Sequence, residues 1–179
     1  GKRASERQVK TMNLADRRVI AFASHALVPG DLDGLDQPAI ALSAPSITGD
    51  NEDGLLTMGE VLGLRLNAAW VVLSACNTAA GEDTGAEAVT GLGRAFFYAG
   101  TRALLVSNWP VETTSAKTLT TELFQRQAAN PKLNRAEALN YTMLQLIDKL
   151  SYMDNKGRVV FSYAHPIFWA PFSLVGDGG

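Results

Sequence analysis

The chain has 179 residues, a net charge of −2 and a hydrophobic fraction of 46%, and charged residues make up 19%. These totals are typical of one globular domain with a substantial core, and they lack the basic excess of nucleic-acid binders. No apolar run reaches the roughly 20 residues of a membrane span, and the polar start does not resemble a signal peptide. We therefore expect neither nucleic acid nor a membrane as a partner.

Cysteine and histidine are scarce. The single cysteine, Cys76, excludes an internal disulfide and fits a reducing compartment, so we expect a cytoplasmic protein. One cysteine and two histidines are also a poor donor set for zinc, and we expect no metal and no other cofactor. The sequence does not begin with Met and opens directly into a helix-like segment. We interpret residues 1–179 as one domain excised from a longer protein.

The first part of the chain alternates short helices with apolar runs. The run 19–23 is continuously apolar, which predicts a strand buried on both faces. Thr57 and Glu60 have capping-box spacing, which marks the start of a helix. In chain order we expect a helix at 4–16, a strand at 19–23, a short apolar stretch at 39–42, turns at 47–54, a helix at 58–63 and the strongest strand at 69–73.

The second part continues the alternation. Gly100 follows a helical pattern and is well placed as its left-handed cap, and Asn134 with Glu137 forms a second capping box. We expect helices at 86–99, 113–127 and 135–150, strands at 103–106 and 172–175, and a turn at 154–157 with β-prone stretches after it. The inward face of the first of these helices carries Val89, Leu92, Phe96 and Ala99.

The order of elements predicts the fold class. Strands that alternate with helices favour an α/β fold with a mostly parallel sheet and helices on both faces. Working residues of such sheets lie at the carboxyl ends of the strands. His25 and Cys76 each lie just past such an end. If their strands are neighbours, about 4.8 Å apart, the two side chains can approach closely.

A cysteine beside a histidine suits nucleophilic catalysis, because imidazole can take the thiol proton and return it to a leaving amine. Each residue also has a structural interpretation, Cys76 as a core residue and His25 as a surface residue. His165 is a rival base, but it precedes Pro166 and is better explained by a structural role. A tyrosine-phosphatase loop is excluded because position 82 is Glu rather than Arg, and the loop 81–85 lacks the Gly-Lys pair of a phosphate-binding loop.

Several segments resemble the CHAT family, caspase-like peptidase domains that are often fused to tetratricopeptide repeats in bacteria. The segment Val19–His25 is similar to the family's strand that ends in its histidine, and Val72–Thr78 is similar to its LSACNT motif. The resemblance spans nearly the whole chain in order. It continues through Asp53–Thr57, Gly91–Gly100, Ser107–Val111, Ala136–Leu139 and the segment from His165 to Phe172.

The resemblance implies a caspase-like sheet whose first strand, ahead of Val19, is missing from these residues. It also implies that His25 is the base and Cys76 the nucleophile, 51 residues apart, a gap similar to that of caspases. The backbone amides of Cys76 and Ala26 would face the oxyanion. Ala26 stands where the family usually has Gly, and it retains an N–H for that role unless the backbone there needs a positive φ.

Substrate contacts have less support in the sequence. Acidic residues near the predicted site would favour Arg or Lys before the scissile bond, or would form a solvated rim. They are Asp31, Asp33, Glu82, Asp83 and Glu112. Trp109 either packs against the domain or, as the resemblance implies, lies beside the substrate groove. The acidic group Asp50, Glu52 and Asp53 is interpreted as a solvated turn rather than an acid–base pair.

The sequence supports two alternative functions. The first is a cysteine endopeptidase, a hydrolase that cleaves specific protein targets and is regulated by tetratricopeptide-repeat or other domains of the full-length protein. The second is a catalytically dormant signalling or protein-interaction module that keeps the caspase-like fold. The His25–Cys76 pair favours the first, whereas the Gly-to-Ala change at position 26 and the missing strand leave room for the second.

Overall fold

The computed structural model describes residues 1–73, 85–109, 111–149 and 151–179, with the backbone alone at 85–90 and 149. Its centre is a four-stranded sheet in the order β1-β5-β6-β9. The first three strands are parallel and β9 is antiparallel to β6, which confirms the mostly parallel sheet. The strands are β1 (Val19–Phe22), β5 (Trp70–Leu73), β6 (Ala103–Ser107) and β9 (Phe172–Gly176).

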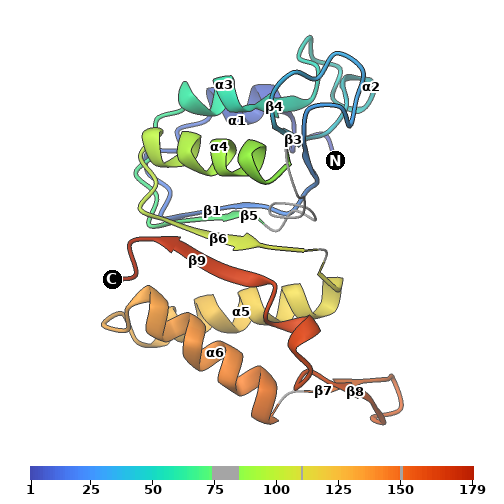
Figure 1. Ribbon diagram of the computed structural model, residues 1–179, viewed down its shortest axis with the longest axis vertical. Coiled ribbons are helices and arrows are strands. Elements are labelled where there is room, and N and C mark those ends of the chain that lie inside the picture. Colours follow the sequence, from blue (N-terminus) through green and yellow to red (C-terminus); the bar gives the residue numbers. More distant parts are fainter. Residues whose placement is uncertain (74–84, 110, 150) are drawn as a thin grey trace.

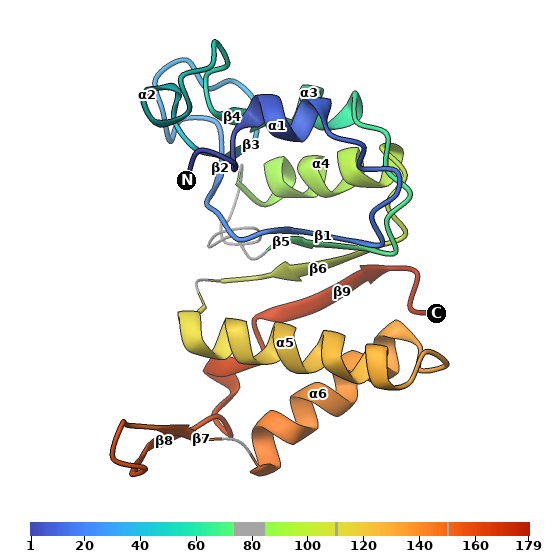
Figure 2. The same ribbon diagram turned by 180° about the vertical axis from the view of Figure 1, so that it is seen from behind.

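Helices cover both faces of this sheet (Figure 1; Figure 2). On one side lie α1 (Glu6–Thr11), α3 (Met58–Leu62) and α4 (Gly85–Tyr98), and on the other lie α5 (Thr113–Ala129) and α6 (Arg135–Lys149). In β5, Val71 and Leu73 belong to the core on the α4 side, whereas Trp70 and Val72 belong to the core on the α5 side. The two-residue period of a strand therefore lets β5 contribute to two cores.

The edge strand β1 differs from its prediction. Ile20 and Phe22 are buried, but Val19 is 41% exposed and Ala21 is also exposed. The prediction of burial on both faces is therefore wrong. β5 is the one neighbour of β1 in the described sheet, and the core on the α5 side includes residues of the other three strands but none of β1.

Smaller elements surround the sheet. β2 (Ala26–Leu27), β3 (Ala39–Ala41) and β4 (Leu55–Thr57) form an antiparallel sheet beside α3, and β7 (Ser151–Met153) pairs with β8 (Val159–Ser162) as a hairpin. A short helix, α2 (Pro45–Thr48), replaces the start of the turns expected at 47–54, and a 3₁₀ turn, η1 (Pro166–Phe168), precedes β9. Among the described residues, no helix combines the length and the apolar character needed to cross a bilayer.

The helix signals read from the sequence are confirmed. Thr57 and Glu60 exchange hydrogen bonds as a capping box, and Asn134 and Glu137 do the same at α6. Gly100 has φ of 109°. On the expected inward face of α4, Leu92, Phe96 and Ala99 are buried, and the side chain of Val89 lies outside the described residues. The helix expected at 4–16 is shorter, since the Ser5 side chain caps its start and it ends at Thr11.

Candidate catalytic site

The two strands that lead to the predicted site are neighbours. β1 and β5 pair in parallel, and the last pair in register is Phe22 opposite Leu73. His25 follows Phe22 by three positions, and Cys76 follows Leu73 by the same number. Cys76, Glu82 and Asp83 lie outside the described residues. The structure shows that the carboxyl ends of β1 and β5 lie at the same edge of the sheet.

His25 stands between β1 and β2, and its side chain is exposed. Its backbone carbonyl accepts a hydrogen bond from the Ala41 N–H at 2.8 Å, and the Ser24 hydroxyl donates to the Ala41 carbonyl. Within the described part of the chain, no hydrogen bond or ion pair engages the imidazole. The backbone of His25 is therefore held by β3.

Ala26 is buried and opens β2, opposite Ile40 of β3. Because the neighbouring pair, His25 and Ala41, is hydrogen-bonded, Ala26 and Ile40 form a non-hydrogen-bonded pair of the antiparallel ladder. The Ala26 N–H consequently points away from β3. Its strand conformation is extended and does not require a positive φ, so alanine serves here without backbone strain.

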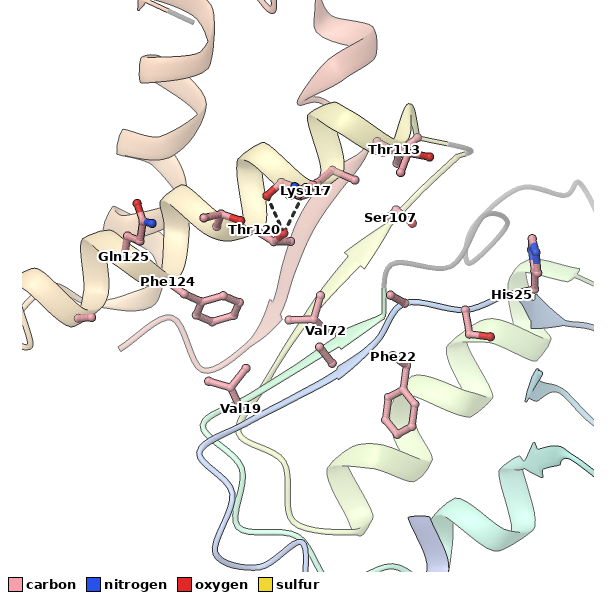
Figure 3. A pocket seen from close by; sticks show the side chains of 17 residues that line it. Val19, Phe22, His25, Val72, Ser107, Thr113, Lys117, Thr120, Phe124 and Gln125 are labelled. Carbon is pink, nitrogen blue, oxygen red and sulfur yellow. Dashed lines mark hydrogen bonds between the residues drawn. The ribbon is translucent and has the colours of Figure 1, made fainter. Parts of the chain in front are cut away.

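A cavity of about 860 Å³ lies between β1 and α5, and we call it the α5 groove (Figure 3). Val19 lies near one end and His25 lines the other. Its walls are mainly apolar and include Ala21, Ala23, Val72, Ala116 and Phe124. Ser107, at the end of β6, and Lys117, on α5, also line it. Sequence analysis did not single out these two residues, because nothing in the strand or helix pattern shows that they face β1.

Glu112 has a structural task that the sequence analysis did not anticipate. It is the N-cap of α5, and its carboxylate accepts hydrogen bonds from the backbone N–H groups of Thr114 at 2.8 Å and Ser115 at 2.7 Å. Partial burial raises the pKa of Glu112, but these hydrogen bonds outweigh it and the net pKa is lowered. In the sequence, the position of Glu112 directly before a predicted helix was the signal that could have identified it as an N-cap.

Trp109 and His165 also have described positions. Trp109 is 39% exposed and belongs to neither core cluster, so its packing role is limited. The described lining of the α5 groove includes neither Trp109 nor Glu112. The Nδ1 atom of His165 accepts a hydrogen bond from the Ile167 N–H at 3.2 Å and caps η1. This cap accounts for His165 as a structural residue.

Two of the three acidic residues of the expected turn, Glu52 and Asp53, accept hydrogen bonds. Asp53 accepts a hydrogen bond from the Leu55 N–H at 2.8 Å. Glu52, Glu6 and Glu60 have carboxylate oxygens within 4.8 Å of one another, a spacing that could hold a metal ion. The Lys10 ammonium occupies the position among the three carboxylates that a metal ion would take. It lies 3.0 Å from Glu6, 2.8 Å from Glu52 and 2.9 Å from Glu60.

The pKa values of two carboxylates in this cluster shift in opposite directions. Burial raises the pKa of Glu6 to about 7, although Lys10 and the Gly54 N–H stabilise its charged form. Burial also acts on Glu60, but hydrogen bonds from the Thr57 backbone and from Lys10 prevail and lower its pKa to about 2. The cluster thus joins α1 to α3 and to the segment before β4 through one ammonium, and its role is structural.

Comparison with known proteins places the domain in a family. The family model of the CHAT domain matches residues 1–177. The chain is also similar to tetratricopeptide repeat protein 28 of Mus musculus, with 31% identity over 126 residues, which is 69% of this chain. It spans 4% of that relative's length. The described fold, a mostly parallel sheet between two helical layers, is compatible with the caspase-like architecture. The chain therefore belongs to the CHAT family, which is related to the caspase-like cysteine peptidases.

Proposed function

We propose that this chain is a cysteine endopeptidase of the caspase-like clan, with Cys76 as the nucleophile and His25 as the base. The observation that carries the proposal is the parallel pairing of β1 with β5, in which Phe22 lies opposite Leu73. Each catalytic candidate follows its strand by the same three positions. Adjacent strands are about 4.8 Å apart, which suits a proton transfer between side chains that leave the same edge.

The chemistry needs no cofactor. The thiolate of Cys76 attacks the peptide carbonyl, and His25 accepts the thiol proton and delivers it to the leaving amine. Water then releases the acyl group from the sulfur. The Ala26 N–H, which points away from β3, and the Cys76 N–H are the proposed donors to the oxyanion.

Substrate selection and control are further parts of the proposal. The substrates are specific proteins, and other domains of the longer natural polypeptide regulate the site. The name of the mouse relative, a tetratricopeptide repeat protein, supports such repeats as the regulatory partner. We place Asp83 and Trp109 beside the bound substrate. The cap on α5 weakens the case for Glu112 as a specificity residue, because both of its carboxylate oxygens are engaged.

Alkylation provides the first test, because Cys76 is the single cysteine of the chain. An unactivated thiol with a pKa of about 8.5 is about 1% ionised at pH 6.5. We expect the wild-type protein to react with iodoacetamide at least about tenfold faster at this pH than the His25→Ala variant. His165→Asn is the matched control, since it removes the other histidine and retains a cap for η1, and it should react like the wild type.

Proteolysis provides the decisive test. The longer natural polypeptide is incubated with a proteome, and newly formed protein amino termini are identified. Wild-type protein should generate a small set of termini that Cys76→Ala and His25→Ala do not. Identical termini from wild type and Cys76→Ala, together with slow alkylation in the wild type, would overturn the peptidase proposal and favour the dormant interaction module.

A further inference from the structure

Five exposed arginines lie at one edge of the central sheet. β1, β5 and β6 are parallel, so their amino ends share the edge opposite to the one where these strands end. The segments that lead into the three strands lie together at the left of Figure 1 and at the right of Figure 2. These segments and the exposed face of α4 carry Arg17, Arg18, Arg65, Arg94 and Arg102, which we call the arginine edge. The whole chain has a net charge of −2, so this edge is positive on a protein that is acidic overall.

The strand register places two of these arginines in one row. β1 pairs with β5, and β5 with β6, so that Arg18 and Arg102 stand on either side of Ala69. The Trp70 N–H donates to the Arg18 carbonyl at 3.0 Å. The Arg102 N–H donates to the Ala68 carbonyl, also at 3.0 Å. Adjacent strands are about 4.8 Å apart, so the two arginine backbones are about 10 Å apart, the length of about three extended residues.

The end of α4 adds an aromatic side chain to the arginine edge. The Leu66 N–H donates to the Ala99 carbonyl at 2.7 Å, which holds the segment of Arg65 against the end of this helix. Arg94 and Tyr98 are four positions apart and therefore lie on the same face of α4. Tyr98 is 83% exposed. Arginine and tyrosine are enriched among the residues that contribute most to the affinity of protein interfaces.

The positive charge of the arginine edge is not neutralised within the described part of the chain. None of its five guanidinium groups forms a described hydrogen bond or ion pair. Two carboxylates lie in the adjoining segments, and both are engaged elsewhere. Asp177 pairs with Arg135 at 3.1 Å, and Asp16 accepts a hydrogen bond from the Asn13 side-chain amide. The arginine edge is therefore complementary to carboxylates from another chain.

A further strand beside β1 would leave this surface open. A strand joins a sheet at its lateral edge, whereas the arginine edge is formed by the ends of strands. The strand expected ahead of Val19 would thus lengthen this end of the sheet. It would not cover Arg65, Arg94 or Arg102, which belong to α4 and to the segments before β5 and β6.

We propose that the arginine edge is a docking surface for an acidic segment of a partner protein. Carboxylates of that segment pair with the guanidinium groups of Arg18, Arg65 and Arg102, in the two-pronged geometry that arginine offers. An apolar side chain between the acidic ones contacts the ring of Tyr98. Nucleic acid is a poorer fit, because the chain lacks the overall basic excess that nucleic-acid binders carry.

Fluorescence anisotropy tests this proposal without any cleavage readout, so its outcome is independent of the peptidase proposal. The probe is a labelled short peptide in which Glu alternates with Ser around one central Leu. The control peptide has Gln in place of every Glu. Residues 1–179 and the longer natural polypeptide are both titrated at low ionic strength, where exposed charges are least screened.

The acidic peptide should bind the wild type at least about tenfold more tightly than the Gln peptide. Arg65→Glu and Arg102→Glu should each weaken its binding at least about fivefold. Lys156→Glu is the matched control, because it changes the net charge equally at an exposed residue of the β7–β8 hairpin, which lies at the other end of the molecule (Figure 1; Figure 2). It should bind like the wild type. If Arg102→Glu does not fold by circular dichroism, Arg102→Gln takes its place.

Three results would overturn the proposal. The first is equal binding of the two peptides, or an equal loss of affinity in Arg102→Glu and Lys156→Glu. The second is displacement of the acidic peptide by a single-stranded DNA oligonucleotide at a lower concentration than unlabelled peptide requires, which would assign the surface to nucleic acid. The third is binding to residues 1–179 but not to the longer natural polypeptide. In that case another part of the same polypeptide covers the arginine edge, and the assignment to a partner protein is wrong.

Discussion

Gly100 shows how one residue decides a helix end. It follows α4 with φ of 109°, and a Cβ built on it would lie 2.2 Å from the Leu66 carbonyl oxygen. That oxygen belongs to the segment that precedes β5, whose Leu66 N–H donates to the Ala99 carbonyl at 2.7 Å. The close contact and the positive φ both exclude a side chain, because the opposing group is backbone and cannot turn aside.

Gly100→Ala should therefore lower the free energy of unfolding by about 3 kcal/mol or more. The control is Gly157→Ala, at a residue whose φ is 73° and whose Cβ would meet nothing within 4 Å. The Gly157→Ala variant tests the strain of a positive φ alone, and it should lower the free energy of unfolding by about 1–2 kcal/mol. Urea unfolding measures both, and equal losses would show that the contact with Leu66 is unimportant.

The cap formed by Glu112 supplies a second prediction at this scale. Glu112→Ala removes the acceptor for the amides of Thr114 and Ser115 and should cost about 0.5–2 kcal/mol of stability. Glu112→Asp retains a capping carboxylate and should stay within about 0.5 kcal/mol of wild type. Denaturant unfolding of the three proteins compares them. An unchanged Glu112→Ala variant would contradict the structural role and return Glu112 to the candidates for substrate recognition.

The helix α1 is anchored by charge as well as by apolar contacts. Its buried Glu6 accepts hydrogen bonds from Lys10 at 3.0 Å and from the Gly54 N–H at 2.9 Å. Lys10 in turn reaches Glu52 and Glu60. A helix of six residues has little stability on its own, so these contacts and the burial of its inner face hold it in place.

The burial of Glu6 predicts a pH dependence of stability, because burial disfavours the charged carboxylate more than Lys10 and the Gly54 N–H favour it. The pKa of Glu6 is raised from 4.5 to about 7, so the folded state holds this proton more tightly than the unfolded state does. Its contribution is fully present below pH 4.5 and is lost as the pH rises to about 7. Over this window the wild type should lose about 1–3 kcal/mol of unfolding free energy relative to Glu6→Gln.

Urea unfolding at a series of pH values measures that difference. Glu60 has the opposite effect in a lower pH range. Its pKa is lowered from 4.5 to about 2, so its contribution to the free energy of unfolding is lost as the pH falls from 4.5 to about 2. Asp154→Asn is the control, because the pKa of Asp154 is lowered by hydrogen bonds from Arg158 and its effect lies below the range tested. Parallel curves for wild type and Glu6→Gln would refute the raised pKa.

At the scale of the whole molecule, one sheet separates two apolar cores. The core on the α4 side contains Leu92 and Phe96, and the core on the α5 side contains Leu119 and Leu123, all of them fully buried. Because alternate residues of β5 and β6 enter opposite cores, neither core can loosen without disturbing the strands that support the other.

Leu92→Ala and Leu119→Ala should each destabilise the protein by about 2–5 kcal/mol, since both side chains are fully buried. Because the cores share their strands, each variant should retain a single unfolding transition with a lower midpoint. Far-ultraviolet circular dichroism and tryptophan fluorescence follow the transition, with Trp70 as a buried reporter on the α5 side. Separate transitions from the two probes would show that the cores unfold independently.

Sequence patterns correctly predicted the elements whose signals lie within a few neighbouring residues. The capping boxes at Thr57 and Asn134, the glycine after α4 and the apolar runs of β5 and β6 each depend on a few neighbouring residues. The exposure of Val19 could not be predicted from the apolar run 19–23, because such a run does not show whether its strand lies in the centre or at the edge of a sheet. The helix α2 was missed because Pro45 in a polar stretch equally suits a turn.

The sequence by itself determined the alternation of strands and helices, the mostly parallel sheet and the membership of His25 and Cys76 in a family motif, because periodicity and short motifs are properties of neighbouring residues. Only the tertiary structure decided that β1 pairs in parallel with β5, with Phe22 opposite Leu73, so that the two strands end at one edge of the sheet. It also decided that β5 is the one strand paired with β1 among the described residues, and that Val19 and Ala21 are exposed. Strand pairing and exposure are set by residues distant in the chain, and side-chain type alone does not encode them.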